Sequence, residues 1–311
     1  MNSPKILNYE TRPLKFTERK MLLGTFLRIC NLFKGGYQYI GFGGLAFTDF
    51  KLFHKELHIN EMYDIEGGLS FEKVSFNSPY SFIKIIPEFS TVALTKIDLE
   101  KKTLIWLDYD GALENYMFQD LTIVMNKLPV GSVYVFTCNR ELKSKETGDL
   151  YQVEEFKEEF GEMVPFDVSD KDFSGSNDFI TIKKMLSNLI DKIMTDRNRN
   201  GENVRFHQLY NILYQENRGA KMFTFGGVIT EADTTIESLN LSGFDFASHD
   251  DTVYKIDIPN LTLKETDLIN NHLADEDEMA RLKSMKIVTE SEIKKYKATY
   301  RYMPTFFDVR L

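Results

Sequence analysis

Three glycines and one acid near the start of the chain have the types and spacing of a nucleotide site. Gly41, Gly43 and Gly44 follow a short apolar run, and Glu66 ends the next one. A turn without Cβ atoms lets the backbone approach a ligand closely, and an acid roughly 20 residues further on can accept hydrogen bonds from both ribose hydroxyls. Here Gly44 and Glu66 are 22 positions apart. The pattern predicts an adenosine-binding set of Gly41, Phe42, Gly43, Gly44 and Glu66.

Two more acids follow a later apolar run. Residues 103–107 read TLIWL, which is typical of a strand buried on both faces, and Asp108 and Asp110 come next. Either carboxylate could take a proton from a substrate, or hold a metal ion that lowers the pKa of a substrate hydroxyl. The structural alternative is that Asp108 caps the following helix and Asp110 forms an Asx turn. Both interpretations stay open on the sequence alone.

Two further side chains are candidates for the same site. His54 lies in the helix expected after the glycine turn, where it could act as a base over the ligand or pack as an ordinary helix histidine. Glu88 follows a predicted strand and could accept a hydrogen bond from an adenine amino group. No metal site is predicted, because the remaining histidines lack the spacing of metal ligands; they are His58, His207, His249 and His272.

Apolar runs that alternate with helical patterns must position these residues. Crossovers of about 20 to 30 residues between such strands require a mainly parallel sheet, with helices on both faces. We therefore predict an α/β fold, a doubly wound Rossmann-like sheet in which ligands bind at the carboxyl ends of the strands. The strands are expected at 37–40, 62–65, 81–86, 103–107 and 132–136, and the helices at 48–57, 69–76 and 115–127.

Four segments are expected to form one compact domain. They are an N-terminal arm and helix (1–36), the ligand-binding core (37–140), a polar insertion and helix (141–203), and a segment that completes the sheet and ends in a helical and aromatic tail (204–311).

The flanking segments carry their own secondary-structure signals. The first helix is predicted at 18–33, with Thr17 as its N-cap and Arg19 on its solvated face. The insertion is expected over the ligand side of the sheet, and the polar residues 195–203 are expected to form a flexible loop. Further helices are predicted at 179–194, 204–214, 263–273 and 289–296, and strands at 222–230 and 252–258.

Composition excludes several classes of protein. The 311 residues carry a net charge of −9 at pH 7, which argues against an extended basic surface for nucleic acid. Two cysteines, Cys30 and Cys138, make neither a disulfide framework nor a metal cluster, so we expect a cytoplasmic protein. The sequence holds no apolar run near the ~18 residues of a membrane span, and no membrane association is predicted.

Three motifs within roughly residues 11–140 carry a family resemblance: RPLKFTERKM, YIGFGGLAFTDF and IWLDYDGAL. The chain resembles class I S-adenosylmethionine-dependent methyltransferases and, more narrowly, a bacterial family labelled putative O-methyltransferase. The resemblance implies S-adenosylmethionine as cofactor, with the glycine turn around its methionine part and Glu66 on its ribose. It also implies that Asp108 and Asp110 lie beside the reactive centre. The acceptor, whether a small molecule, RNA or protein, is left open.

Departures from the superfamily pattern bear on the activity. The turn reads GFGG where GxGxG is usual, and LDYDG lacks the proline pair of enzymes that methylate exocyclic base nitrogens. The segment NSPY at 77–80 imitates that motif but precedes the third predicted strand, so we interpret it as a turn. One alternative is a methyltransferase-fold sensor or partner subunit without methyl transfer, in a bacterial defence or regulatory system. A dehydrogenase fits poorly because GxGxxG is not met.

Overall fold

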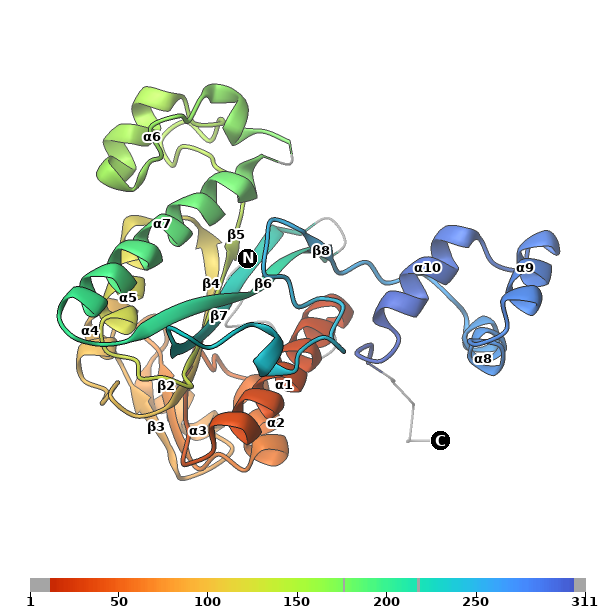
Figure 1. Ribbon diagram of the computed structural model, residues 1–311, viewed down its shortest axis with the longest axis horizontal. Helices are drawn as coiled ribbons and strands as arrows, with labels where there is room; N and C mark the ends of the chain where they lie inside the picture. The colour runs from red at the N-terminus through yellow and green to blue at the C-terminus, as the bar shows by residue number, and fades with distance from the viewer. Residues whose placement is uncertain (1–11, 176, 217–218, 305–311) are drawn as a thin grey trace.

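The computed structural model describes residues 12–175, 177–216 and 219–304, and a single sheet lies at the centre of this part of the chain (Figure 1). Its strand order is β3-β2-β1-β4-β5-β7-β6-β8. Strands β1 to β5 pair in parallel, β7 is antiparallel to β5 and β6, and β8 is parallel to β6. The prediction of a mainly parallel sheet is confirmed. The strands are β1 (Gln38–Gly41), β2 (Glu61–Ile65), β3 (Ile83–Ile86), β4 (Thr103–Ala112), β5 (Val133–Asn139), β6 (Val204–Gln215), β7 (Lys221–Glu231) and β8 (Tyr254–Lys255).

Helices cover both faces of the sheet, as the doubly wound fold requires. Buried side chains of α1, α2 and α3 form one apolar cluster with the sheet, and those of α4, α5 and α7 form another on the opposite face. The α-helices are α1 (Pro13–Phe33), α2 (Thr48–Leu57), α3 (Phe71–Asn77), α4 (Ser90–Thr95), α5 (Asn115–Met125), α6 (Val153–Phe160), α7 (Asp178–Arg199), α8 (Leu263–Asn271), α9 (Glu276–Ser284) and α10 (Glu290–Thr299). Short 3₁₀ turns lie at Gly161–Met163, Asp170–Phe173 and Glu237–Leu239.

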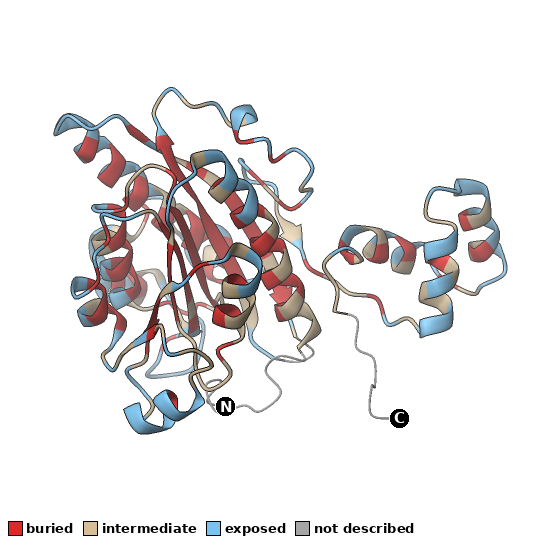
Figure 2. Cartoon of the chain, turned by 90° about the horizontal axis from the view of Figure 1, so that it is seen from below, coloured by how far each residue is buried: buried red, intermediate tan, exposed pale blue. Residues whose placement is uncertain are grey.

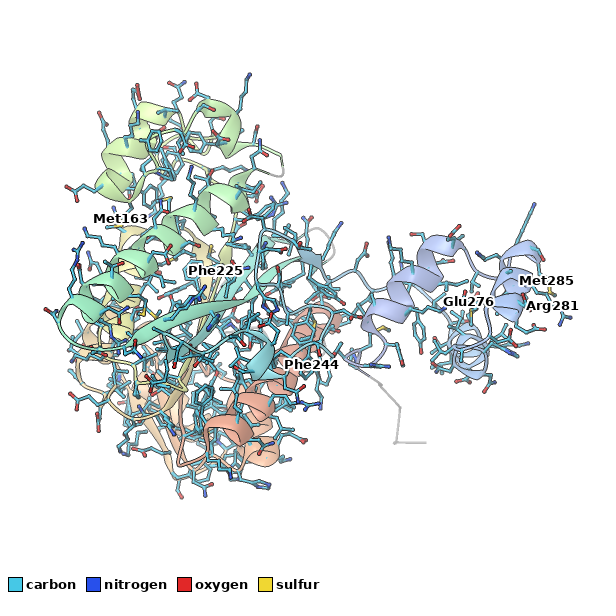
Figure 3. The ribbon with its side chains drawn as sticks, viewed as in Figure 1. Met163, Phe225, Phe244, Glu276, Arg281 and Met285 are labelled. Atoms are coloured by element: carbon cyan, nitrogen blue, oxygen red, sulfur yellow. The ribbon has the colours of Figure 1, made fainter. Side chains whose placement is uncertain are left out.

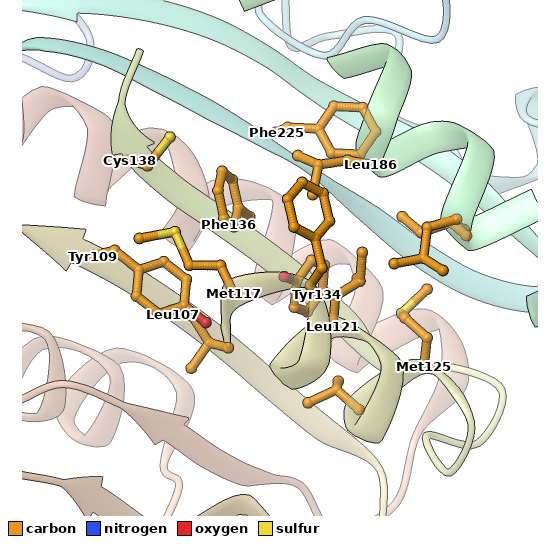
Figure 4. Close-up of a cluster of buried hydrophobic side chains, with 14 of the residues drawn as sticks. Leu107, Tyr109, Met117, Leu121, Met125, Tyr134, Phe136, Cys138, Leu186 and Phe225 are labelled. Carbon is orange, nitrogen blue, oxygen red and sulfur yellow. The ribbon is translucent and has the colours of Figure 1, made fainter. Parts of the chain in front are cut away.

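The alternation of side chains along the central strands explains the two clusters. On β4, Leu104 and Trp106 join the α1 side, whereas Ile105 and Leu107 join the α5 side, because successive residues of a strand point to opposite faces. Figure 4 shows Leu107 among the aromatic and methionine side chains of β5 and α5. The strands are buried along most of their length (Figure 2). Each large apolar side chain buried in this way contributes roughly 1.5–3 kcal/mol.

The N-terminal helix begins earlier than predicted. Helix α1 starts at Pro13, whose fixed φ suits the first helical position and whose missing N–H is not needed there. Thr17 is not the N-cap, because its hydroxyl donates to the Pro13 carbonyl at 2.8 Å inside the helix. Arg19 is buried rather than solvated. The first turns of α1 therefore direct charged side chains toward the sheet.

Residues 204–214 form a strand, so the helix predicted there is wrong. They belong to β6, which pairs with β7 along its length. At Gly227 of β7 a Cβ atom would lie 2.0 Å from the His207 carbonyl oxygen, so the close approach of these two strands depends on glycine. A short apolar run does not separate helix from strand by its periodicity alone. The strand predicted at 222–230 is confirmed as β7.

Helix α7 continues through part of the predicted flexible loop, up to Arg199. Arg197 is buried and donates to the carbonyl oxygens of Met125 and Leu128 at 2.7 and 3.0 Å. Its guanidinium also pairs with Glu202 at 2.6 Å. These bonds stabilise the last turn of the helix, and the prediction of flexibility at 195–199 is therefore wrong.

Two parts of the chain extend beyond the layered core (Figure 1). The insertion between β5 and α7 contains α6 and packs Phe160 against Phe118 of α5. Helices α8, α9 and α10 form a lobe with an apolar cluster of its own, and Arg281 and Met285 lie at its far end (Figure 3). Most of the predicted aromatic tail lies outside the described residues. No helix in the described part of the chain is long and apolar enough to cross a membrane.

Candidate functional site

The glycine turn lies between the end of β1 and the start of α2. The Gly43 N–H donates to Asp64 Oδ1 at 2.7 Å, which ties the turn to the neighbouring strand β2. A Cβ atom at Gly43 would lie 2.8 Å from the Phe47 ring and 3.0 Å from Asp64 Oδ1. Gly44 has φ +53°, a conformation that favours glycine. Both glycines are therefore required by the local geometry.

Several polar atoms under this turn are buried without a partner. Among the described residues, Asp64 Oδ2, the Tyr39 hydroxyl and the Thr48 hydroxyl make no hydrogen bond. Burial raises the pKa of Asp64 to about 7, although the bond from Gly43 opposes this shift. Unsatisfied buried polar atoms are uncommon and call for an explanation. A ligand at the turn would supply a partner for the Thr48 hydroxyl, because Thr48 lines the adjoining cavity.

A cavity of about 580 Å³ opens at the carboxyl ends of β1, β2 and β4. This volume lies in the range of small-molecule and cofactor sites, roughly 300–1,000 Å³. It brings together predicted site residues that are far apart in sequence: Phe42, Gly43, Gly44, Glu66, Asp108 and Asp110. Side chains that the sequence analysis did not assign to the site also line it, among them Arg19, Thr48, Phe89, Thr91, Tyr109 and Tyr116. Gly41 is not in the lining and lies directly before it, at the end of β1.

Glu66 lies at the end of β2, as predicted, and one of its oxygens already has a structural role. Oε1 accepts the N–H groups of Gly68 and Leu69 at 2.9 and 3.0 Å. Oε2 makes no hydrogen bond with the part of the chain that the structure describes. This arrangement fixes the carboxylate at the cavity and leaves its second oxygen available for a ligand.

Asp108 lies where the regular pairing of β4 with β5 stops, and it contacts the N-terminal helix. Its Oδ1 accepts a hydrogen bond from Lys15 Nζ at 2.7 Å, and its side chain is 12% exposed. Asp110 is exposed at the mouth of the same cavity. Strand pairing shifts register between Asp108 and Ala112, so regular sheet geometry does not fix the two acids. Both lie in strand β4, and neither caps α5, whose N-cap is Glu114.

A buried acid on α5, which the sequence did not single out, holds two side chains that line the cavity. Asp120 accepts the Thr91 hydroxyl at 2.7 Å and the Tyr109 hydroxyl at 2.8 Å. Burial raises the pKa of Asp120, and hydrogen bonds from Thr91, Tyr109 and Ser90 oppose that shift. The signal in the sequence was an acid on the apolar face of a helix, within NYMFQDLTIVM.

An ion pair between two helices closes the other side of the cavity. The Arg19 guanidinium of α1 pairs with the Asp49 carboxylate of α2, and both residues are buried and line the cavity. Removing one partner of a buried pair of this kind strongly destabilises the folded protein, because the other charge is left buried without a partner. Charge at these positions gave no signal in the sequence, because Arg19 and Asp49 are 30 positions apart.

Besides Gly41, two of the predicted residues do not line the cavity, and both lie away from the glycine turn. His54 contacts the Tyr80 and Phe82 rings at 4.5 and 4.8 Å, and its Nδ1 lies 3.1 Å from the Ile59 carbonyl oxygen. Glu88 pairs with Lys96 at 2.6 Å on the surface, next to Phe89, which does line the cavity. The structure does not bring His54 or Glu88 to the site, and their roles remain predictions.

The sequence of the chain matches one protein family over nearly its whole length. The family is described as "Putative O-methyltransferase", and its model matches residues 7–311. A comparison with curated proteins found no significant match.

Solved structures similar to this chain share little sequence with it. N-methyltransferase NodS from Bradyrhizobium japonicum WM9, in complex with S-adenosyl-L-homocysteine, is 12% identical, with 68% of this chain and 85% of that chain covered and a TM-score of 0.37. Spermidine synthase from Thermotoga maritima is 12% identical, with 78% and 68% covered and a TM-score of 0.38. An rRNA methylase from Streptococcus thermophilus is 6% identical, with 67% and 95% covered and a TM-score of 0.35. These TM-scores, all below 0.5, support no argument about function.

Proposed function

We propose that this chain, which belongs to the family described as "Putative O-methyltransferase", methylates a hydroxyl acceptor at the cavity described above, with S-adenosylmethionine as methyl donor. The observation that carries this proposal is the meeting of Gly43, Glu66 and Asp108 at one cavity. Gly43 and Glu66 follow the ends of β1 and β2, and Asp108 lies where the regular pairing of β4 with β5 stops. In open α/β sheets, ligands bind at such carboxyl ends.

The residues around the cavity fit an adenosyl cofactor. The glycine turn leaves open the space that a Cβ atom would fill, so the backbone can approach the methionine part. The second oxygen of Glu66 can accept hydrogen bonds from the ribose hydroxyls. Phe89 and Tyr116 offer aromatic faces against which a purine ring can pack. The unpartnered Thr48 hydroxyl adds one polar contact at the start of α2.

The chain's own contribution to the reaction is alignment and proton removal. The glycine turn and Glu66 would hold S-adenosylmethionine, which would supply a methyl group activated by its positively charged sulfonium. We propose that the carboxylate of Asp110, which is exposed at the cavity mouth, accepts the proton that the acceptor hydroxyl loses. Asp108 forms an ion pair with Lys15 and contributes a negative charge in a fixed position instead.

Binding experiments, followed by methyl-transfer experiments, test this function. Calorimetry should detect S-adenosylmethionine and S-adenosylhomocysteine binding, and no NAD binding. Transfer of labelled methyl groups to fractionated metabolites, RNA and protein from a bacterial extract should then give a labelled product. Asp110→Asn should lower the transfer rate by roughly 10²-fold or more at unchanged cofactor affinity. Absence of any binding by the folded protein would refute the site assignment.

The same experiments separate catalysis from a binding role. A sensor or partner subunit would bind the cofactor and label nothing, and Asp110→Asn would leave its biological effect intact. We also propose a cytoplasmic location in a bacterium, which the free Cys30 and Cys138 support. Localisation of the tagged chain by cell fractionation tests this part.

A further inference from the structure

We propose that the first turns of α1 belong to the functional site: Lys15 positions the Asp108 carboxylate at the cavity, and Glu18 positions Lys15. The inference rests on the proposed function, because the positioned charge faces the cofactor cavity. It assigns a role to a helix that precedes the glycine turn and contributes no residue to the nucleotide motif.

Lys15 is held by groups from three elements. Its Nζ donates to Glu18 Oε2 at 2.7 Å, to Asp108 Oδ1 at 2.7 Å and to the Tyr214 hydroxyl at 3.1 Å. The ammonium also lies 4.2 Å from the centre of the Trp106 ring, a favourable cation–π contact. Lys15 is only 3% exposed. A long and flexible side chain is thereby restricted to one position.

Glu18 connects Lys15 to strand β7. It is completely buried, and its Oε1 accepts the hydroxyl hydrogen of Thr224 on β7. Burial raises the pKa of Glu18, and Lys15 opposes that shift. Since the hydrogen of Thr224 points to Glu18, the 2.9 Å bond between Thr137 and Thr224 must have Thr137 as donor.

A hydrogen bond and a cation–π contact of Trp106 on β4 complete the network. The indole Nε1 of Trp106 donates to the Thr137 hydroxyl at 3.0 Å, and the face of the same indole lies against Lys15. The network therefore runs from α1 through β7 and β5 to β4 and returns to α1. Asp108 follows Trp106 by two residues, where the pairing of β4 with β5 becomes irregular. The network supplies the fixed geometry that the sheet stops providing there.

Stability alone does not account for this arrangement. Burying a lysine and two carboxylates costs desolvation energy, and apolar residues of similar volume are often as stable or more stable. A buried charged network does restrict its members to one conformation when all of them have partners. At the edge of a cavity that binds a sulfonium cation, one orientation of a carboxylate has a direct use.

A double-mutant cycle on cofactor binding tests the inference. Calorimetry compares S-adenosylmethionine, which carries the sulfonium charge, with neutral S-adenosylhomocysteine for wild type, Lys15→Met, Asp108→Asn and the double variant. We expect each single variant to weaken S-adenosylmethionine binding about tenfold more than S-adenosylhomocysteine binding. The double variant should lose no more than Asp108→Asn alone, because Lys15 acts through Asp108. Lys15→Arg should restore much of the discrimination between the two ligands.

Lys20→Met, a half-buried position on the same helix, is the matched control and should bind both ligands as wild type does. Three results would overturn the inference: additive losses in the double variant, wild-type discrimination in Lys15→Met, or tighter S-adenosylmethionine binding, as simple removal of a positive charge would give. If Lys15→Met does not fold, Glu18→Gln replaces it in the same cycle with the same criteria. A wild-type protein that binds neither ligand refutes the proposed function, and with it this inference.

Discussion

The backbone N–H of Gly43 donates to Asp64 Oδ1 at 2.7 Å, so the glycine turn of the site is held by an acid near the carboxyl end of the neighbouring strand β2. The pairing of β1 with β2 places Gly41 directly opposite Asp64, and the turn begins at that point. The acid that the sequence singled out, Glu66, follows two residues later, directly after the end of the strand. Asp64 therefore holds the glycine turn, whereas Glu66 holds the backbone at Gly68 and Leu69 with one oxygen and lines the cavity.

Asp64→Asn should change how stability depends on pH. The pKa of Asp64 is about 7 in the folded chain and 3.8 as its ordinary value, so between these values the folded state binds the proton more strongly. The free energy of unfolding of wild type should then fall as pH rises from 4 to 7. The variant lacks this dependence and should gain up to about 3 kcal/mol relative to wild type between pH 5 and pH 7. Denaturant unfolding across this range measures the difference.

Glu56→Gln, an exposed position on α2, controls for the removal of a charge and should show no comparable change. A stability difference between Asp64→Asn and wild type that stays constant from pH 5 to pH 8 would contradict the assigned pKa.

Gly43→Ala should weaken cofactor binding. The added Cβ would lie 2.8 Å from the Phe47 ring and 3.0 Å from Asp64 Oδ1, so the turn must shift, at a cost of roughly 1–3 kcal/mol in stability. Calorimetry should show S-adenosylmethionine affinity lowered at least about tenfold. Gly36→Ala is the control, because nothing lies within 4 Å of its Cβ position. Equal affinity of the two variants would exclude a close backbone approach at Gly43.

Glu66→Gln should weaken binding through the ribose. The variant retains one oxygen for the Gly68 and Leu69 N–H groups, and loses charge-assisted bonds to hydroxyls worth roughly 1.5–3 kcal/mol. We expect methylthioadenosine affinity to fall about 10- to 100-fold. For the 2′-deoxy analogue the loss should be clearly smaller, because one of the two hydroxyls is absent. Glu61→Gln on the same strand serves as control, and equal losses for both ligands would argue against a ribose contact.

Asp120→Asn should disturb both stability and the site. In the variant, an amide group replaces one of the oxygens that accept the Thr91 and Tyr109 hydroxyls, so one buried hydroxyl faces another donor. We expect a loss of about 1–3 kcal/mol in unfolding free energy, and weaker cofactor binding because both hydroxyl residues line the cavity. Gln119→Ala, exposed on the same helix, should leave both quantities unchanged. Removing the Tyr109 hydroxyl as well (Y109F) should recover part of the lost stability, and a further loss would argue against this contact.

Local pattern was sufficient for the parallel core of the fold. Apolar runs such as TLIWL and the glycine turn YIGFGG depend on neighbours in sequence, and each corresponds to an observed element, β4 and the β1 turn. Because parallel strands all end at one edge, Gly43, Glu66 and Asp108 were expected together, and they line one cavity.

Pairing across the fold decided the rest. The strand β6 was predicted as a helix. It forms a strand because it pairs with β7, whose glycines let the two backbones approach, and local periodicity does not show this pairing. The pairs of Lys15 with Asp108 and Arg19 with Asp49 join positions 93 and 30 residues apart, and no periodicity links such positions. The sequence by itself therefore determined the parallel strands β1 to β5 and the acids near their carboxyl ends. Only the tertiary structure decided which charges are buried against those acids, because desolvation and pairing depend on contacts between distant segments.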